Sequence, residues 1–278
     1  MGSRVVGFYE FGAASGRPVL ALHGTPACGA GFSFADDAAR GLGLRVIAPD
    51  RPGVGLSSPE VGWGISTYPA MIDDLADALG IDRFSVWGYS GGGPYAVACA
   101  ALLADRLDKA AVCAGAGQVG VWAELAEFEK TDRQMLEMSR RRPRLARILL
   151  SVAGRVARVA PSTVVKSFEK ELSASDRAVV ASYASPAEAI ALFTQALLHG
   201  SRGVVDDYRV LGGPWNVDLT AITVPTRIFQ GTDDTMVPLR HSKALADRVA
   251  TAELIEWPGE GHLATVSHVD EVLGWLAE

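Results

Sequence analysis

Cysteine is scarce in this chain of 278 residues, which has only three: Cys28, Cys99 and Cys113. An odd number at such wide spacing predicts neither a disulfide framework nor a cysteine-based metal site. Cys99 and Cys113 lie in apolar stretches, so we expect their thiols to be buried as small apolar groups. Sparse, unpaired cysteines are typical of a reducing compartment.

Long apolar runs are also missing. A transmembrane helix needs roughly 18 or more consecutive apolar residues, and no run in this chain approaches that length. Residues 1–7 lack the apolar core of a signal peptide. We therefore expect a cytoplasmic protein that does not bind a membrane.

Positive charge is in deficit, because 26 Lys and Arg stand against 32 Asp and Glu, for a formal net charge of −6. This balance provides no attraction for nucleic acid or for an anionic membrane, so a small molecule is the expected partner. Hydrophobic residues make up 49% of the chain, enough at this length for one large core with or without an insertion. The oligomeric state stays open between monomer and homodimer.

Short apolar runs alternate with segments of helical periodicity at both ends of the chain. Such alternation predicts an α/β fold with a mostly parallel sheet that is covered by helices on both faces. Ligands of such sheets bind beyond the carboxyl ends of the strands. Strands are expected at 5–11, 18–22, 45–49, 84–87, 109–114, 226–230 and 253–257, and helices at 32–41, 71–79, 95–103, 240–249 and 269–276.

Residues 118–213 interrupt this alternation. They contain no convincing strand, only amphipathic helical stretches broken by Pro and Gly, and they carry 14 basic and 11 acidic residues within a negative chain. We expect a first core part at 1–117, an all-helical insertion at 118–213 and a second core part at 214–278. The basic run at 140–144 predicts a solvated helix end, with an acid-binding patch as the alternative.

The segment 88–92, Gly-Tyr-Ser-Gly-Gly, joins an expected strand to an expected helix and fits the pattern G-x-S-x-G. The turn is so sharp that side chains at Gly88 and Gly92 would clash. Ser90 is thereby held in strained geometry above the sheet edge and at a helix N-terminus, where free N–H groups favour negative charge. Ser90 is our candidate nucleophile, with an incidental glycine-rich turn as the alternative.

A serine hydroxyl needs a base to take its proton, and a histidine base needs a carboxylate to orient it. The order expected for this topology is serine, acid, histidine. Asp234 and His262 follow Ser90 in that order, each after an expected strand. Asp233 is the second choice for the acid. The alternative for either aspartate is a turn residue whose side chain bonds to its own backbone.

Two backbone N–H groups are needed to bind the oxyanion. One is expected from Gly91, the residue after the nucleophile, and the other from the loop 23–26, His-Gly-Thr-Pro. Pro26 has no N–H, so Thr25 is the choice in that loop. His23 precedes the serine and is expected to shape the same loop.

These segments together resemble the α/β-hydrolase superfamily. The resemblance rests on 23–26, on 50–57 (Asp-Arg-Pro-Gly-Val-Gly-Leu-Ser), on the turn at Ser90, on 231–238 (Gly-Thr-Asp-Asp-Thr-Met-Val-Pro) and on Gly261-His262. It implies that the insertion is the family's cap domain, and that 214–218 is the return from the cap. Haloalkane dehalogenases and epoxide hydrolases of this family use aspartate as nucleophile, so the serine argues against both.

The expected function is that of a capped serine hydrolase, most simply a carboxylesterase, that acts on a small apolar ester through an acyl-enzyme and needs no metal or organic cofactor. The expected pocket residues are Tyr89, Trp122, Phe128, Phe193 and Trp215, with Leu149, Leu150 and Leu197 as further candidates. Packing in the core of the cap is the alternative for each of the cap residues.

Other activities on the same fold stay open. The resemblance also extends to proline iminopeptidases, lactonases and carbon–carbon bond hydrolases. An iminopeptidase needs an acidic anchor for a free amine, for which the cap offers Glu124, Glu127, Glu188 and Asp206. Hydroxynitrile lyases use the triad as a base without acyl transfer, and some members of the fold bind a ligand without catalysis.

Overall fold

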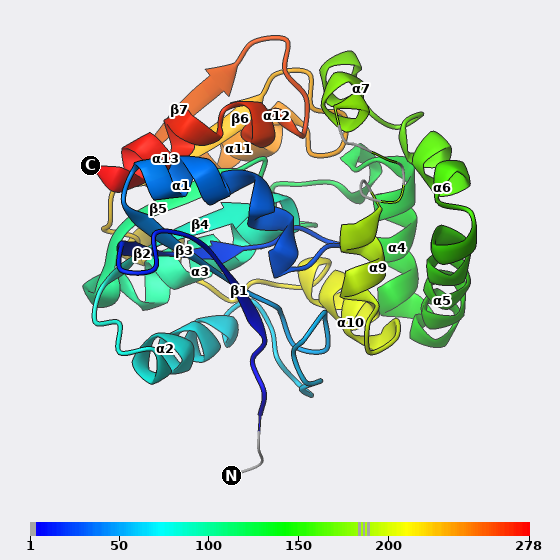
Figure 1. The fold of residues 1–278 in the computed structure, drawn as a ribbon, viewed down its shortest axis with the longest axis horizontal. Coiled ribbons are helices and arrows are strands. Elements are labelled where there is room, and N and C mark those ends of the chain that lie inside the picture. The colour runs from blue at the N-terminus through cyan, green and yellow to red at the C-terminus, as the bar shows by residue number, and fades with distance from the viewer. Residues whose placement is uncertain (1–3, 183–184, 186, 188–189) are drawn as a thin grey trace.

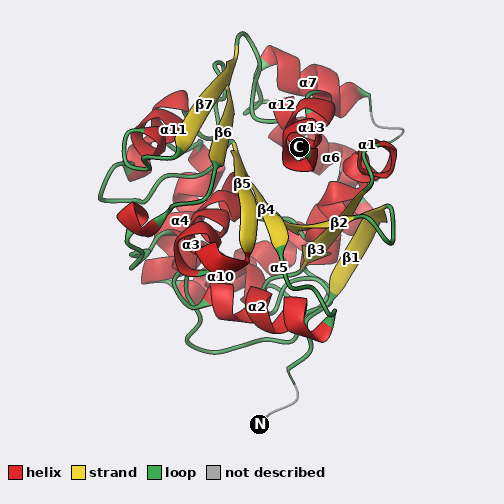
Figure 2. Ribbon diagram, turned by 90° about the vertical axis from the view of Figure 1, so that its left-hand side faces the viewer, coloured by secondary structure: helices red, strands yellow, loops and turns green. Residues whose placement is uncertain are grey.

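The computed structural model describes residues 4–278 apart from 183–184, 186 and 188–189. Its centre is a seven-stranded sheet with the strand order β1-β3-β2-β4-β5-β6-β7, whose twist Figure 2 shows. All neighbouring strands are parallel except β1 and β3, which run antiparallel. The strands are β1 (Phe8–Gly12), β2 (Arg17–Leu22), β3 (Leu44–Pro49), β4 (Phe84–Tyr89), β5 (Leu107–Cys113), β6 (Thr226–Gly231) and β7 (Ala252–Trp257). The predicted α/β fold with a mostly parallel sheet is confirmed.

Helices cover both faces of the sheet, as Figure 1 shows. Alternate strand residues point to opposite faces. Val19 and Trp87 therefore pack on the face covered by α1 and α13, whereas Leu20 and Val86 pack on the face covered by α2 and α3. The elements of the core are η1 (Gly29–Ala35), α1 (Asp36–Gly41), α2 (Tyr68–Ala78), η2 (Ser90–Gly92), α3 (Gly93–Leu102), η3 (Ala104–Arg106), η5 (Leu219–Ala221), α11 (Leu239–Ala246), α12 (Ala264–Ser267) and α13 (Val269–Ala277). All three cysteines are free and buried, which was expected for Cys99 and Cys113.

The insertion is built from helices that lie beside the carboxyl ends of the strands (Figure 1). Its elements are η4 (Leu125–Glu127), α4 (Lys130–Arg141), α5 (Pro143–Val159), α6 (Pro161–Phe168), α7 (Ala174–Ala181), α9 (Ala191–Ala196) and α10 (Arg202–Leu211). The β pairing described in this part of the chain amounts to one isolated bridge between Val119 and Ala123. Residues Leu136, Leu150 and Tyr208 of the insertion join the same apolar cluster as one face of the sheet, so the insertion packs directly on the core.

Helix α5 has one buried and one exposed apolar face. Ala146, Leu150 and Ala157 are buried, whereas Ile148 and Leu149 are exposed on the outer side. In the described residues no single helix is long and apolar enough to cross a bilayer, and only α5 and α6 taken together reach that length and composition, across a bend of 117°.

Candidate active site

The turn at Ser90 has the crowded geometry that its glycines predict. A Cβ atom at Gly92 would lie 1.9 Å from the carbonyl oxygen of Leu22, and one at Gly88 would lie 2.6 Å from the carbonyl oxygen of Gly92. Ser90 itself has φ of 54°, in the left-handed region that side chains rarely adopt. Strain of this kind persists only where the surrounding structure enforces it, and here it sets the hydroxyl at the end of β4 and the start of η2 and α3.

His262 lies against Ser90 although 172 residues separate them in sequence. The Nε2 atom of His262 is 2.9 Å from Oγ of Ser90. The backbone N–H of His262 donates to Asp176 of α7, and the hydroxyl of Tyr89 donates to the carbonyl oxygen of His262. The ring of Tyr89 also stacks on the imidazole, with ring centroids 5.5 Å apart. The loop after β7 is therefore fixed both from the insertion and from the strand that carries the serine.

Asp234, and not Asp233, is the carboxylate that meets this histidine. Its Oδ2 atom is 2.8 Å from Nδ1 of His262. Its Oδ1 atom accepts the backbone N–H groups of Met236 and Val237, each at 2.8 Å, and the side chain of Gln230 donates to Oδ2. Asp233 is exposed in the same turn. The structure thus forms a continuous chain of hydrogen bonds from a buried carboxylate through an imidazole to a strained serine.

Thr25 and Gly91 adjoin Ser90 from two sides. A Cβ atom built on Gly91 would lie 2.7 Å from Oγ1 of Thr25, and one built on Gly24 would lie 3.1 Å from Cβ of Ser90. The loop after β2 therefore packs directly on the turn that carries Ser90. Thr25, Ser90 and Gly91 line one pocket together, which brings the two expected oxyanion donors to the same place.

A fully buried ion pair holds the loop that contains Thr25. The guanidinium of Arg51, in the loop after β3, donates to the carbonyl oxygens of His23 and Gly24 and to both carboxylate oxygens of Asp207 on α10. Asp207 also accepts the hydroxyl of Thr25 at 2.6 Å and that of Tyr95 at 2.7 Å. The side chains of Arg51 and Asp207 are 0% and 2% exposed. The insertion is thereby tied to the loop beside the serine.

His23 belongs to this assembly rather than to the serine. Its Nε2 atom accepts the backbone N–H of Arg51, and its Nδ1 lies 2.7 Å from the carbonyl oxygen of Gly24. Burial, with the nearby positive charge of Arg51, holds the pKa of His23 well below 6.5, so the ring is neutral. These contacts agree with the loop-shaping role expected for it.

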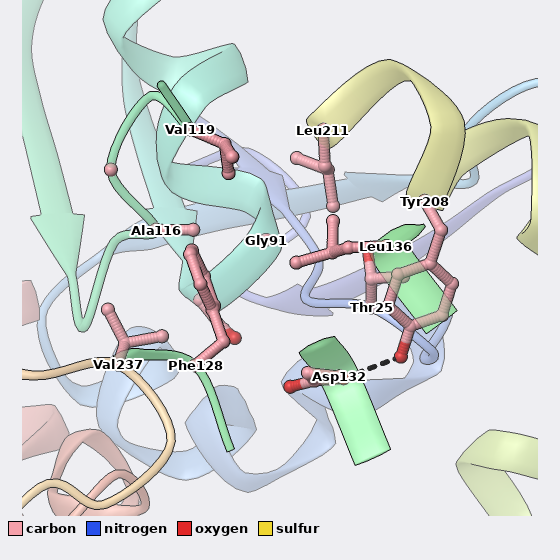
Figure 3. A pocket seen from close by; sticks show the side chains of 12 residues that line it. Thr25, Gly91, Ala116, Val119, Phe128, Asp132, Leu136, Tyr208, Leu211 and Val237 are labelled. Carbon is pink, nitrogen blue, oxygen red and sulfur yellow. Dashed lines mark hydrogen bonds between the residues drawn. The ribbon is translucent and has the colours of Figure 1, made fainter. Parts of the chain in front are cut away.

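The pocket in front of Ser90 lies between the core and the insertion, and Figure 3 shows its side chains. The empty space between its lining side chains, together with its solvent-open mouth, is about 390 Å³. The lining residues are Thr25, Ser90, Gly91, Ala116, Gly117, Val119, Phe128, Asp132, Leu136, Tyr208, Leu211 and Val237. The wall is mostly apolar, and besides Ser90 its polar side chains are Thr25, Asp132 and Tyr208.

Of the five aromatic residues expected in the pocket, the structure brings only Phe128 into its lining. Trp122 and Trp215 pack edge to face at 4.9 Å, and Phe193 packs half-buried against the main apolar cluster. The ring of Tyr89 stacks on the imidazole of His262 instead. The leucine candidates differ too, because Leu149 is exposed on α5 while Leu150 and Leu197 are buried in packing. Aromatic side chains in an amphipathic stretch are used here mainly to build the core of the insertion.

The acidic residues considered as amine anchors are also not in the pocket lining. Glu127 pairs with Arg240 and His241, Asp206 lies near three arginines, and Glu124 caps η4. Glu188 lies outside the described residues.

Sequence reasoning missed Asp132, which is the acidic residue that does line the pocket. It lies in the first turn of α4, where an acidic residue is ordinarily a solvated partner of the helix dipole. Its carboxylate accepts the hydroxyl of Tyr208 at 2.7 Å. Burial raises the pKa of Asp132 to about 6.

In the described residues no group of three or more His, Cys, Asp and Glu side chains has the arrangement of a metal site.

Comparison with known proteins agrees with this architecture. Residues 17–269 match the model of the family described as alpha/beta hydrolase fold, and the chain therefore belongs to that family. A relative from Caulobacter named "Putative carbamate hydrolase RutD" is 30% identical over 234 residues, which is 80% of this chain and 76% of that protein. Haloalkane dehalogenase 2 of Mycobacterium tuberculosis is 36% identical over 95 residues, and the matched segment spans only about a third of that enzyme.

Among solved structures, an esterase from Thermogutta terrifontis superimposes with a TM-score of 0.71 at 23% identity, over 98% of this chain and 93% of that one. At this identity the likeness concerns the fold. The resemblance to α/β hydrolases expected from the motifs is thus confirmed at the level of the family.

Proposed function

We propose that the protein is a serine hydrolase that cleaves ester-type acyl bonds of small, largely apolar molecules. The observation that carries the proposal is the unbroken chain from Oγ of Ser90 through His262 to Asp234, with contacts of 2.9 and 2.8 Å, at the edge of a pocket. Each contact lies within the range required for a nucleophile, its base and the group that orients the base.

In this proposal the oxygen of Ser90 attacks the acyl carbonyl while Nε2 of His262 takes its proton. Asp234 keeps the proton of the imidazole on Nδ1 and stabilises the imidazolium that forms. The backbone N–H groups of Thr25 and Gly91 bind the oxyanion, where preorganised donors lower the barrier by several kcal/mol. His262 then protonates the leaving alcohol, and a water activated by His262 frees the acyl group from Ser90.

The walls of the pocket support an apolar acyl or alcohol group, because Val119, Phe128, Leu136 and Leu211 face it. The mechanism uses side chains and backbone of this chain alone. Serine at the nucleophile position favours acyl transfer over the dehalogenation named for one of the relatives.

A fluorophosphonate probe tests the proposal directly. An activated serine is phosphonylated with loss of fluoride, so intact-protein mass spectrometry should show one adduct on the wild type and none on Ser90→Ala. The same protein is then assayed with an ester, a lactone, a carbamate, an amide and a carbon–carbon substrate. An unlabelled, folded wild type would contradict a serine hydrolase and favour a ligand-binding role.

Hydrolysis is expected to slow as the pH falls, because His262 must be unprotonated to accept the proton of Ser90. Burial lowers the pKa of His262, but the carboxylates of Asp234, Asp176 and Asp132 outweigh burial and leave this pKa above 6.5. The acidic limb of kcat/KM should therefore lie above that value in the wild type. Asp234→Asn should move it to lower pH while reducing the rate, because the imidazolium loses its counter-charge.

The pH profile of kcat/KM from about pH 5 to about pH 9 measures both effects. Asp233→Asn is the matched control, since its carboxylate is exposed and next in the same turn. A profile that is flat over this range would remove His262 as the base. If Asp234→Asn and Asp233→Asn moved the acidic limb of kcat/KM by the same amount, the displacement would be an effect of surface charge and not of the contact with His262.

A further inference from the structure

The pocket contains one carboxylate among otherwise neutral walls. Asp132 comes from α4 and Tyr208 from α10, and both line the pocket that Ser90 also lines (Figure 3). The hydroxyl of Tyr208 donates to Oδ1 of Asp132 at 2.7 Å. This contact fixes the side chain of Asp132, so the carboxylate has a defined position within the pocket.

The other carboxylate oxygen of Asp132, its Oδ2 atom, is free to bind a substrate group as far as the described residues show. Within the described part of the chain, the hydrogen bonds of Asp132 leave its Oδ2 atom without a donor. A carboxylate oxygen has room for two donors, and a pocket acceptor without one loses its hydration at a cost when the pocket fills. A substrate that places a hydrogen-bond donor beside Oδ2 of Asp132 would recover this lost free energy of hydration, whereas a purely apolar substrate would not.

The charges around the carboxylate of Asp132 favour a substrate group that donates a hydrogen bond over one that accepts it. Glu129 at the start of α4, Glu171 and Asp234 add negative charge near Asp132, and His262 is the basic group that faces it. Burial and these carboxylates raise the pKa of Asp132 only to about 6, so it is mainly ionised above that pH. An ammonium or a hydroxyl group is therefore attracted to this position, and an anionic group is repelled.

We propose that Asp132, fixed by Tyr208, is a specificity-determining residue that binds a hydroxyl or ammonium group of the substrate. The preferred substrates are then esters that carry such a donor a few bonds from the scissile carbonyl. This inference rests on the proposed esterase chemistry of Ser90 and adds the class of substrate to it. The alternative is that Asp132 only joins α4 to α10, in which case its removal changes stability and not selectivity.

Matched substrates that differ in one terminal group test the proposal. The first series is 4-nitrophenyl butanoate, 3-hydroxypropanoate and 3-aminopropanoate, which end in methyl, hydroxyl and ammonium. The second places the same groups on the alcohol, as the propyl, 2-hydroxyethyl and 2-aminoethyl esters of acetate. Each kcat/KM is divided by the rate constant of that ester for hydroxide hydrolysis, because the polar groups themselves activate the carbonyl.

In at least one series, the wild type should prefer a polar ester over its methyl counterpart by roughly tenfold or more, as expected for a hydrogen bond to a charged group. Asp132→Leu should abolish this ratio for both donors. Asp132→Asn should abolish it for ammonium but retain part of it for hydroxyl, since the amide oxygen still accepts a hydrogen bond. The ratio cancels any general loss of activity in these variants.

Asp206→Asn serves as the matched control, because it makes the same chemical change on α10 at a carboxylate that does not line the pocket. Its ratio should equal that of the wild type. A wild-type ratio near one in both series, or a ratio that survives in Asp132→Leu, would overturn the proposal. Failure of the esterase chemistry itself is distinguishable, since then no ester is turned over and fluorophosphonate leaves Ser90 unlabelled.

Discussion

Replacement of Ser90 by alanine is expected to lower kcat by more than about 10³-fold while leaving the fold intact. The substitution removes the oxygen that we propose as the nucleophile and its 2.9 Å contact with His262. Alanine retains the Cβ atom that the turn already accommodates at φ of 54°, so little new strain arises. The measurements are kcat with an ester found by the substrate panel and the thermal unfolding temperature of both proteins.

Ser151→Ala provides the control for this experiment, because Ser151 is an exposed serine on α5 that does not line the pocket. It should retain wild-type kcat. Activity that persists in Ser90→Ala with an unchanged fold would contradict the assignment of the nucleophile. Equal losses in both variants would indicate an unspecific effect of the substitutions.

Breaking the buried pair of Arg51 and Asp207 is expected to have the largest effect on stability. Asp207→Ala leaves a guanidinium that is 0% exposed without its counter-charge and removes the acceptor for Thr25 and Tyr95. Removal of one partner of such a pair typically costs about 3–5 kcal/mol. We also expect a lower kcat, because the loop that carries the N–H of Thr25 loses its support from α10.

The exposed pair of Arg83 and Asp108 gives a matched comparison, since its side chains are 55% and 54% exposed. Asp108→Ala should cost at most about 1 kcal/mol. Unfolding in urea measures both free energies. The double variant Arg51→Met with Asp207→Leu should recover part of the loss, because no isolated charge is then buried. Equal destabilisation by Asp207→Ala and Asp108→Ala would contradict the role of this pair.

The sharp turn at Ser90 could be predicted from the sequence because its steric requirements are local. A strand, a glycine two residues before the serine, a glycine two residues after it and a helix all lie within one short segment. The clash of 1.9 Å that a Cβ at Gly92 would make with Leu22 is the physical content of that pattern. The approach of Asp234 and His262 followed from topology, because the ends of parallel strands share one edge of the sheet.

The choice between Asp233 and Asp234 needed the tertiary structure. Both residues follow β6, and only the turn up to Val237 determines which carboxylate points inwards. The pocket was harder to predict, because amphipathic helices of the insertion contain more apolar residues than the pocket uses. Trp122 and Trp215 pack edge to face against each other instead of lining the pocket, and their sequence positions carry no sign of this.

By itself, the sequence determined the α/β class, and it predicted the helical insertion, the sharp turn at Ser90 and a candidate order of serine, acid and histidine. The α/β class, the insertion and the turn depend on the periodicity of apolar residues and on steric demands within a few residues, both of which are visible along the sequence. The order of the three residues depends on the topology that this periodicity predicts. Only the tertiary structure decided the walls of the pocket and the pairs that control it. Asp132 meets Tyr208 across 76 residues and Arg51 meets Asp207 across 156. Such long-range partners are selected by the packing of α4 on α10 for the first pair and of the insertion on the core for the second, because a charge is stable in the interior only where packing brings it a partner.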